Sequence, residues 1–301
     1  MAYLEVDKIS KSFGEVKAAQ NISMTVDGGA IYGLLGPNGA GKTTTIRMIM
    51  SIIMPDEGSV KILGKERDYY ATDHIGYLPE ERGLYRKMKV GETLQFLASI
   101  KSLRGSKVKG VIDTWLERMG LAEWKNKKVE ELSKGMQQKI QFIATIIHDP
   151  DIIILDEPFA GLDPINVNLL KDIILELKNK GKAIVFSTHM MESAEKLCDH
   201  IYLVNKGTLI VNGKLRDVKG EYGRDSVLIE FKGDDSFLKT SPEIRSFNQY
   251  ENVAEIRLNK GADSQKLLQT VMKNAEIYRF ECTEPSLNAI FIEKVKYSNS
   301  N

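Results

Sequence analysis

The apolar residues of this chain follow two periods, which divide the sequence into strand-like and helix-like stretches. Residues 3–9 and 22–26 alternate apolar and polar positions, as half-buried antiparallel strands do. Residues 30–35, 152–155 and 183–187 are short, mostly apolar runs, which are typical of strands buried on both faces of a parallel sheet. The pattern predicts an α/β fold that combines a parallel core with a smaller antiparallel β subdomain.

Helical spacing replaces these strand patterns between about residues 84 and 147. Apolar residues recur every three or four positions in two segments, and no strand pattern interrupts them. We therefore expect a helical subdomain inserted into the α/β core, and a further helix over about 165–179. The apolar positions of the two segments are Leu94, Phe96, Leu97 and Ile100, and Val111, Ile112, Trp115, Leu116 and Met119.

Residues 220–301 are predicted to form a small α+β domain that is separate from a first domain, residues 1–219. Three stretches alternate as strands do, and the spacing predicts helices around 267–272 and 287–295. These residues contain no set of polar side chains that would converge on a site, so packing or an interface is the expected role. The apolar positions of the three strands are Val227, Ile229 and Phe231; Ala254, Ile256 and Leu258; and Tyr278, Phe280 and Cys282.

Composition narrows the class of protein. The proportions of hydrophobic (42%) and charged (28%) residues are ordinary for a soluble protein, and a net charge of +1 gives no electrostatic case for binding nucleic acid. No apolar run approaches the ~18 residues of a membrane-spanning helix, so a role in a membrane process would need a span from another polypeptide. Cys198 and Cys282 have neither metal-ligand nor redox spacing.

The first candidate site is the segment Gly36–Thr43, which fits the phosphate-loop pattern G-x-x-x-x-G-K-[ST]. A buried strand precedes it, and residues 44–53 carry apolar side chains at helical spacing, so the loop joins a strand to a helix. Glycines let backbone N–H groups point at phosphate oxygens, and the positive end of the helix dipole adds to the attraction. Lys42 is expected to reach the β- and γ-phosphates, and the Thr43 hydroxyl to hold Mg²⁺. The predicted nucleotide-binding residues of this segment are Gly36, Pro37, Asn38, Gly39, Ala40, Gly41, Lys42, Thr43 and Thr44.

Polar side chains follow two other buried strands. Asp156 and Glu157 end the run that begins at Ile152, and His189 follows the run over 183–187. Ligands of open α/β sheets bind at the carboxyl ends of the strands, so these side chains are expected beside the phosphate loop. Asp156 can hold Mg²⁺, Glu157 can accept a proton from the attacking water, and the His189 ring can reach a γ-phosphate oxygen.

Two further features have both a functional and a structural interpretation. Phe13 precedes a glycine in a predicted turn, where its ring could stack on a purine base or fill a small core. Ser133 suits the N-cap of a helix running to about His148, and the open start of this helix is either a second anion site or an ordinary helix start. His148 falls at the C-terminus of that helix, where the helix dipole favours a charged ring.

Together these motifs resemble the ATP-binding subunit of an ABC transporter over about residues 2–218. By this resemblance Gly36–Thr43 is the Walker A loop, residues 152–157 are the Walker B strand with the catalytic glutamate, and His189 is the switch histidine. Phe13 falls where the family has its adenine-stacking aromatic. The resemblance thus implies a P-loop NTPase fold with ATP and Mg²⁺ as its ligands.

Two other segments carry the same resemblance. Leu132–Gln137 stands where the family has its LSGGQ signature, with Lys134 at the third position and Met136 before Gln137. Residues 160–163 correspond to the D-loop. Ser133, Gly135 and Asp163 are therefore implied to bind nucleotide.

Glu80 is the second departure from the family pattern, because most members carry the glutamine of the Q-loop there. We expect Glu80 to take part in catalysis and to contact Mg²⁺. The segment Tyr77–Tyr85, the lysine-bearing signature and the segment Pro285–Asn288 are similar to a bacterial subgroup. That subgroup includes sodium-efflux-type ATPases with a C-terminal accessory domain, which favours export and makes a small cation a candidate substrate.

The resemblance also implies partners. Two ATP-binding subunits, identical or homologous, would meet head to tail, with Ser133 and Gly135 of one capping the γ-phosphate held by Lys42 of the other. An integral membrane permease would be the second partner, with this chain peripheral on the cytoplasmic side of the membrane. The alternative is a soluble ABC ATPase acting on ribosomes or nucleic acid, although such members usually carry two nucleotide domains or a long coiled-coil insert. A non-hydrolysing nucleotide-binding module conflicts with the presence of Glu157.

Overall fold

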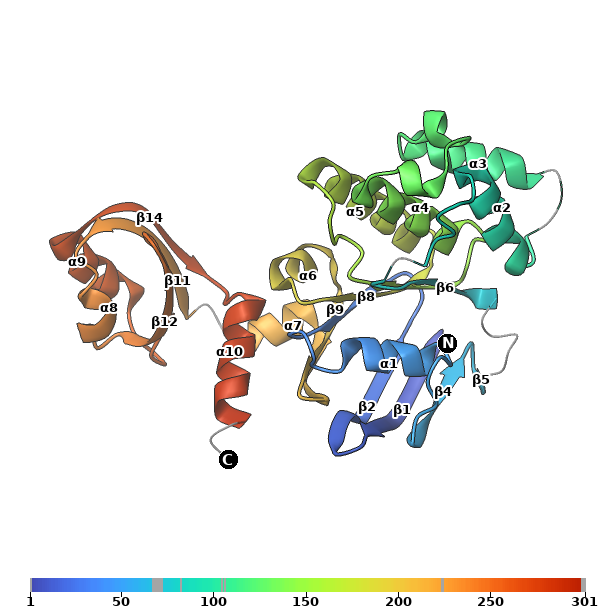
Figure 1. The fold of residues 1–301 in the computed structure, drawn as a ribbon. Helices are drawn as coiled ribbons and strands as arrows, with labels where there is room; N and C mark the ends of the chain where they lie inside the picture. Colours follow the sequence, from blue (N-terminus) through green and yellow to red (C-terminus); the bar gives the residue numbers. More distant parts are fainter. Residues whose placement is uncertain are drawn as a thin grey trace. The chain divides into compact units, whose positions relative to one another are not determined.

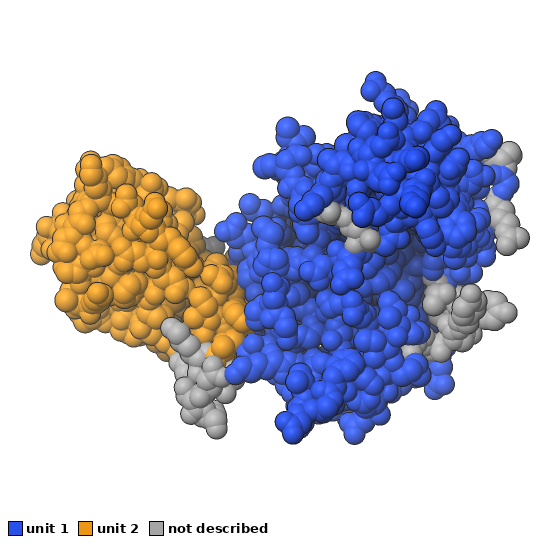
Figure 2. All heavy atoms as spheres, in the orientation of Figure 1, with its two compact units in different colours: residues 1–212 blue, residues 213–301 orange. Residues whose placement is uncertain are grey.

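The computed structural model describes residues 2–66, 73–81, 83–103, 105, 107–222 and 225–298. Two compact units, residues 1–212 and 213–301, are coloured separately in Figure 2. The division between them falls just before helix α7 (Leu215–Gly220), and the domain boundary proposed from the sequence, 219/220, falls at the end of that helix.

A six-stranded sheet in the order β10-β9-β3-β8-β7-β6 is the centre of the first unit (Figure 1). Five of its strands, β6, β7, β8, β3 and β9, pair in parallel. β3, β7 and β8 are buried at every position, which confirms the strands expected from the apolar runs. Their carboxyl ends therefore meet at one edge of the sheet. The strands are β3 (Ile31–Leu35), β6 (Ile75–Leu78), β7 (Ile152–Asp156), β8 (Ala183–Thr188), β9 (His200–Asn205) and β10 (Thr208–Lys214).

Helix α1 (Lys42–Ile49) follows β3 and lies between the six-stranded sheet and a smaller antiparallel sheet (Figure 1). Its Ile46, Met48 and Ile49 side chains belong to one hydrophobic core with residues of both sheets. The expected helix over 44–53 is wrong at its C-terminal end, because Ser51 has a left-handed φ of 62°. The opposite face of the six-stranded sheet is covered by the helices α5 (Pro164–Asn179) and α6 (Met191–Leu197).

The smaller sheet, in the order β2-β1-β4-β5, confirms the antiparallel β subdomain. Its first two strands are longer than the segments 3–9 and 22–26 that alternate in sequence, and a tight turn at Gly14 (φ 58°) joins them. Register shifts between Val6 and Ser12 break the two-residue period, which explains the underestimate. The strands are β1 (Leu4–Phe13), β2 (Val16–Val26), β4 (Glu57–Ile62) and β5 (Lys65–Glu66).

The inserted helical subdomain consists of three helices and two short 3₁₀ turns. Leu94, Ile112, Leu116 and Met119 are buried, as the helical spacing predicts, whereas Ile100 is 56% exposed. The elements are α2 (Val90–Ile100), α3 (Lys107–Arg118), η2 (Ala122–Trp124), η3 (Val129–Glu131) and α4 (Lys134–Ile146).

The second unit contains a four-stranded antiparallel sheet in the order β12-β13-β11-β14, packed against α8 and α9 through one hydrophobic core. The expected alternation of Tyr278, Phe280 and Cys282 is wrong for the two outer residues. A bulge pairs Phe231 with Ile277, so Ile277 and Phe280 pack on the core while Tyr278 is 56% exposed. The elements are β11 (Ser226–Gly233), α8 (Phe237–Thr240), β12 (Ile244–Tyr250), β13 (Val253–Leu258), α9 (Ser264–Asn274), β14 (Ala275–Thr283) and α10 (Leu287–Ser298).

Within the described ranges, none of the helices has both the length and the apolar character that a membrane crossing requires.

Candidate ATP-binding and hydrolysis site

The phosphate loop connects the carboxyl end of β3 to the first turn of α1. Gly41 precedes α1 with a left-handed φ of 105°, and Gly36 has a φ of 153°. A Cβ atom on Gly36 would lie 2.2 Å from the carbonyl oxygen of Val204, and one on Gly41 would lie 2.2 Å from that of Ala18. Only glycine fits at these two positions, and the loop keeps the start of α1 open for an anion.

Lys42 is the first residue of α1, and its side chain turns back into the loop. Its Nζ donates hydrogen bonds to the carbonyl oxygens of Gly36 (2.7 Å) and Pro37 (3.1 Å), and the residue is only 6% exposed. Burial lowers the pKa of Lys42, against the opposing effect of the Glu157, Asp156 and Glu80 carboxylates. A phosphate in the loop would be a charged partner for this ammonium in place of neutral carbonyls.

Asp156 ends β7 and is fully buried. The Ser187 hydroxyl donates to its Oδ1, whereas its Oδ2 is buried without a hydrogen-bond partner in the described part of the chain. Burial raises the pKa of Asp156, and hydrogen bonds from Ser187 and Thr43 act in the opposite direction. An unpartnered carboxylate oxygen beside a threonine hydroxyl fits Mg²⁺, which prefers hard oxygen ligands.

The protein offers few other ligands for such a cation within the described residues. Among the residues that the structure describes, no group of three or more His, Cys, Asp or Glu side chains could hold a metal. Phosphate oxygens and water would complete the coordination, as Mg²⁺ usually requires.

Glu157 is held by the end of β8 across the sheet edge. Its Oε2 accepts a hydrogen bond from the Thr188 hydroxyl (3.0 Å), and its Oε1 accepts from the His189 backbone N–H (2.9 Å). The His189 ring also lies against Oε1, with Nδ1 at 2.7 Å. Glu157 has a left-handed φ of 48°, which is rare outside glycine and is found most often at functional sites. The structure therefore brings Glu157 and His189 together as the sequence predicts.

One open cleft of about 620 Å³ contains most of the predicted residues. Glu80 lines it together with both strand-end acids, so the substituted Q-loop position faces the nucleotide site. Lys17 and Lys206 also line the cleft, and the sequence analysis missed both because neither belongs to a motif. The predicted residues in the lining are Asn38, Gly39, Ala40, Gly41, Lys42, Thr43, Thr44, Glu80, Asp156 and Glu157.

Phe13 lies just outside this cleft. It is the last residue of β1 and pairs with Val16, which lines the cleft. Its ring is 50% exposed, so it does not fill a core, and the Lys11 ammonium lies 5.9 Å from the ring centroid. Stacking on a base is compatible with this position and stays a prediction.

Ser133, Gly135 and Asp163 are not among the residues that line the cleft. Ser133 caps α4, with its Oγ accepting from the Met136 N–H (3.2 Å), and is exposed. Asp163 caps α5 in the same way through the Asn166 N–H (3.0 Å), and this hydrogen bond lowers the pKa of its carboxyl. The structure does not bring these three residues together with the phosphate loop in this cleft.

A second, mostly apolar groove of about 300 Å³ lies where α2 and α4 meet β6. The Glu80 loop (residues 79–84, with Arg82 outside the described residues) contributes Pro79, Gly83 and Leu84 to it. The same short loop thus borders the cleft through Glu80 and the groove through Pro79, Gly83 and Leu84.

His148 lines this groove, and the expectation that the helix dipole favours its charged form is wrong. Burial, together with the Lys101 charge, lowers the pKa of His148 to about 4, which outweighs the effect of the helix dipole. Both ring nitrogens are buried without a hydrogen-bond partner in the described part of the chain. The ring is therefore neutral near pH 7.

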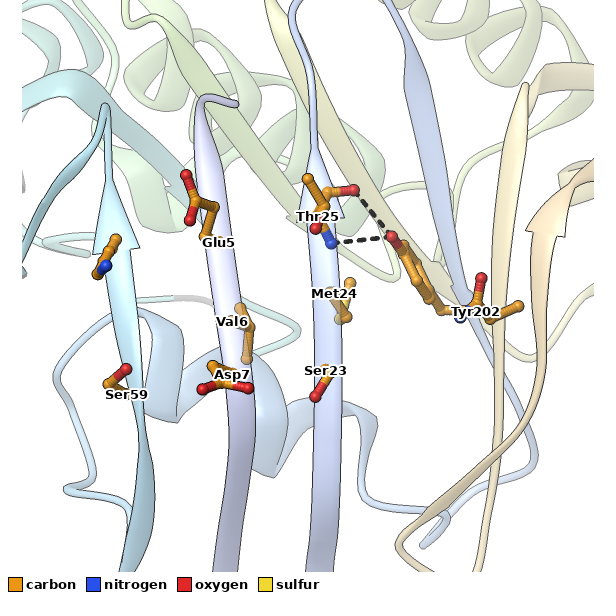
Figure 3. Close-up of a pocket in the computed structure, with 10 residues that line it drawn as sticks. Glu5, Val6, Asp7, Ser23, Met24, Thr25, Ser59 and Tyr202 are labelled. Carbon is orange, nitrogen blue, oxygen red and sulfur yellow. Dashed lines mark hydrogen bonds between the residues drawn. The ribbon is translucent and has the colours of Figure 1, made fainter. Parts of the chain in front are cut away.

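The hollow drawn in Figure 3 lies on the antiparallel sheet, with a volume of about 580 Å³. The Tyr202 hydroxyl accepts from the Thr25 N–H (3.0 Å) and donates to the Thr25 carbonyl (2.8 Å), which ties β9 to β2. Glu5 and Asp7 of β1 give this hollow acidic groups in place of a phosphate loop. Lys61 also lines this hollow, and no residue of the phosphate loop does.

These features define a P-loop ATPase, with a phosphate loop, a buried strand-end aspartate and a hydrogen-bonded glutamate at one sheet edge. Comparison with known proteins refines this class. Residues 19–160 match the ABC transporter family, and residues 213–295 match the family described as ATP-binding protein DrrA1-3-like, C-terminal domain.

Individual relatives match over two thirds of the chain or more. The uncharacterized ABC transporter ATP-binding protein YhaQ of Bacillus subtilis is 44% identical over 292 residues, which cover 97% of this chain and 98% of that protein. ABC transporter ATP-binding protein NatA of the same organism is 38% identical over 67% of this chain and 84% of its own length. A solved structure described as the ATP binding subunit of an ABC transporter matches with a TM-score of 0.70 and 30% identity, over 73% of this chain and 93% of that one.

This chain therefore belongs to the family of ABC transporter ATP-binding subunits. It is an ATPase whose ligands are ATP and Mg²⁺. The relatives are named as transporter proteins, which does not support the alternative of an ATPase acting on ribosomes.

Proposed function

We propose that this chain powers export of a substrate through a separate integral membrane permease, as a peripheral subunit on the cytoplasmic side of the membrane. One observation carries the proposal: the Glu80 loop borders both the nucleotide cleft and the apolar groove. A rearrangement of this loop during ATP hydrolysis would change the shape of a surface that a partner can bind.

In this proposal the cleft residues divide the chemistry. Lys42 binds the phosphates, and Glu157 accepts a proton from the attacking water through Oε2, whose one donor among the described residues is the Thr188 hydroxyl. Bound Mg²⁺, held by Thr43 and Asp156, would neutralise charge on the phosphates. His189 then faces the γ-phosphate, and Phe13 stacks on the adenine.

Two subunits meet head to tail around the nucleotide. The exposed start of α4 at Ser133 and Gly135 supports this arrangement, because a helix N-terminus attracts an anion and its own chain's cleft does not include it. Asp163 would approach the same interface from the start of α5. Glu157→Gln should trap ATP and dimerise on its addition, and Ser133→Arg in that background should prevent dimerisation. A molar mass by light scattering that ATP does not change would argue against a homodimer.

The permease is proposed to dock in the apolar groove. Ile100 lines it from α2 together with Leu97 and is 56% exposed, so a partner can bury its side chain there. Ile100→Glu should abolish co-purification of a membrane permease from detergent-solubilised membranes. Leu175→Glu, at a half-exposed position of α5 outside the groove, is the control and should retain the permease. Retention by both variants would contradict this docking site.

The candidate for the exported substrate comes from the resemblance of two segments, Tyr77–Tyr85 and Pro285–Asn288, to sodium-efflux-type ATPases. This makes Na⁺ the first substrate to test, in inverted membrane vesicles that contain the permease and this chain. ATP-dependent Na⁺ uptake that Glu157→Gln abolishes would support cation export. Uptake unaffected by that variant would exclude it.

A further inference from the structure

Gln141 holds the Glu80 loop from the helix that starts at Ser133. The residue lies in α4 and is 5% exposed. Its Nε2 donates to the carbonyl oxygens of Pro79 (3.3 Å) and Glu81 (3.3 Å), the two residues that flank Glu80. Because both partners are acceptors, the amide nitrogen must face the loop, with one hydrogen for each carbonyl.

Helix α4 extends this connection to the other candidate anion site. Gln141 lies eight residues after Ser133, which corresponds to about 12 Å along a helix. The same helix also lies against β6, where the Thr145 hydroxyl is 3.3 Å from the Tyr77 carbonyl oxygen and shares its single hydrogen with the Gln141 carbonyl oxygen (2.9 Å). A displacement at the start of α4 would therefore reach the backbone on both sides of Glu80.

We propose that Gln141 is a positioning residue that couples the Glu80 loop of one nucleotide cleft to the signature serine at the start of α4. The coupling rests on the proposed function, in which Ser133 contacts the nucleotide of a second subunit. Through Gln141, a nucleotide bound against Ser133 would shift Glu80 in the cleft of the same chain. The two sites of a dimer would then respond to each other through α4.

The amide oxygen of Gln141 connects the Glu80 loop with the apolar groove. Its Oε1 is buried and has no hydrogen-bond partner among the described residues, and Gln141 itself lines the groove. An N–H or O–H donor on a molecule seated in the groove can bind this oxygen. Such an occupant would contact the same side chain that holds the Glu80 loop.

The test replaces Gln141 by methionine, which keeps the length of the side chain and removes both donors. Backbone hydrogen–deuterium exchange in residues 79–84 should become about fivefold faster, as expected for the loss of an ordinary hydrogen bond. kcat for ATP hydrolysis should fall by a similar factor, while the Kd for ATP stays within twofold because the phosphate loop is unchanged. Ile143→Val removes a methyl group from a fully buried residue of the same helix, and should change neither the exchange nor kcat.

The results for these variants distinguish a role of Gln141 in holding the Glu80 loop from a general loss of protein stability. If Gln141→Met and Ile143→Val give the same exchange in residues 79–84, or if faster exchange leaves kcat unchanged, the proposal is wrong. Gln141→Glu provides a second variant: it loses the donors and places a carboxylate against the two carbonyl oxygens, so exchange in residues 79–84 should be at least as fast as in Gln141→Met. Inactive wild-type protein would instead contradict the proposed function, and the exchange measurement would still decide whether Gln141 holds the loop.

Discussion

The Nδ1 atom of His189 lies 2.7 Å from Oε1 of Glu157. The same oxygen accepts the His189 backbone N–H, and the Thr188 hydroxyl binds the other oxygen. Among the described residues, the hydrogen bonds that the Glu157 side chain accepts come from Thr188 and His189, at and just after the end of β8. A carboxylate has about four acceptor sites, so Oε2, with Thr188 as its one donor among these residues, can still accept a proton from water.

The first prediction concerns Glu157 itself. Glu157→Gln keeps the hydrogen-bonding shape but lacks a base, so kcat should fall at least ~10²-fold while ATP binding is kept. Steady-state hydrolysis and equilibrium nucleotide binding test this. Lys42→Ala is the matched contrast and should abolish binding, since it removes the ammonium from the phosphates. Near-normal hydrolysis by Glu157→Gln would refute the role of the glutamate.

Asp156 gives a prediction on stability. Burial raises its pKa, so its ionised form destabilises the nucleotide-free protein near pH 7. Asp156→Asn should raise the unfolding temperature in EDTA by ~2–4 °C, which corresponds to about 1 kcal/mol for a domain of this size. In wild type, Mg²⁺ together with ATP should raise the unfolding temperature more than ATP alone does, and Asp156→Asn should lose this difference. Asp172→Asn, at an exposed position of α5, should show neither change in thermal unfolding. A lower unfolding temperature for Asp156→Asn would contradict this account.

His148 gives a prediction on pH dependence. Its pKa is lowered to about 4 in the folded chain by burial and by Lys101, against the smaller opposite effects of the Ile75 backbone, Asp73 and Asp149. Between that value and the ordinary value near 6.5, the unfolded chain binds more protons, so the free energy of unfolding falls as the pH falls. We expect a loss of about 1–2 kcal/mol across this window, since water at the open groove screens part of the effect.

His148→Leu should remove this part of the pH dependence, as measured by urea unfolding at pH 7 and pH 5. His74→Leu changes an exposed histidine and should keep the wild-type difference between the two pH values. Equal pH dependence in wild type and His148→Leu would mean that the ring takes up a proton without cost in the folded state.

Glu80 is expected to make the cleft more dependent on Mg²⁺. It lines the cleft with Asp156 and Glu157, and like charges at close range repel unless a cation offsets them. Glu80→Gln should keep ATPase activity within about tenfold, a change of ~1.4 kcal/mol or less. It should also lower the Mg²⁺ concentration at half-maximal activity. Mg²⁺ titrations at fixed ATP that superimpose for the two proteins would show that Glu80 has no part in metal binding.

The sequence predicts those parts of the site that depend on local order. Lys42, Asp156 and His189 each follow a buried strand, and parallel strands place their carboxyl ends at one edge, so the cleft follows from three short segments. Contacts between distant segments leave no such pattern. Gln141 and Glu81 are 60 positions apart, and nothing in the spacing of α4 distinguishes a glutamine that holds a loop from a solvated one.

The elements that sequence reasoning missed have a similar physical cause. Tyr278 breaks the alternation of its strand because a bulge absorbs one residue, and bulges have no consistent sequence signal. Strand β12 was not predicted because its residues alternate only weakly between buried and exposed positions. His148 was misjudged because the helix dipole can be read from sequence, whereas burial cannot.

The exposed position of Ser133, outside the cleft of its own chain, has a kinetic consequence. If hydrolysis needs Ser133 from one copy and Lys42 from another, the rate in dilute solution rises with the square of the protein concentration. A permease that binds two copies would replace this dependence by a fixed local concentration, which for short tethers is in the millimolar range. Free subunits would then hydrolyse little ATP, and ATP hydrolysis would begin when two subunits assemble on the permease.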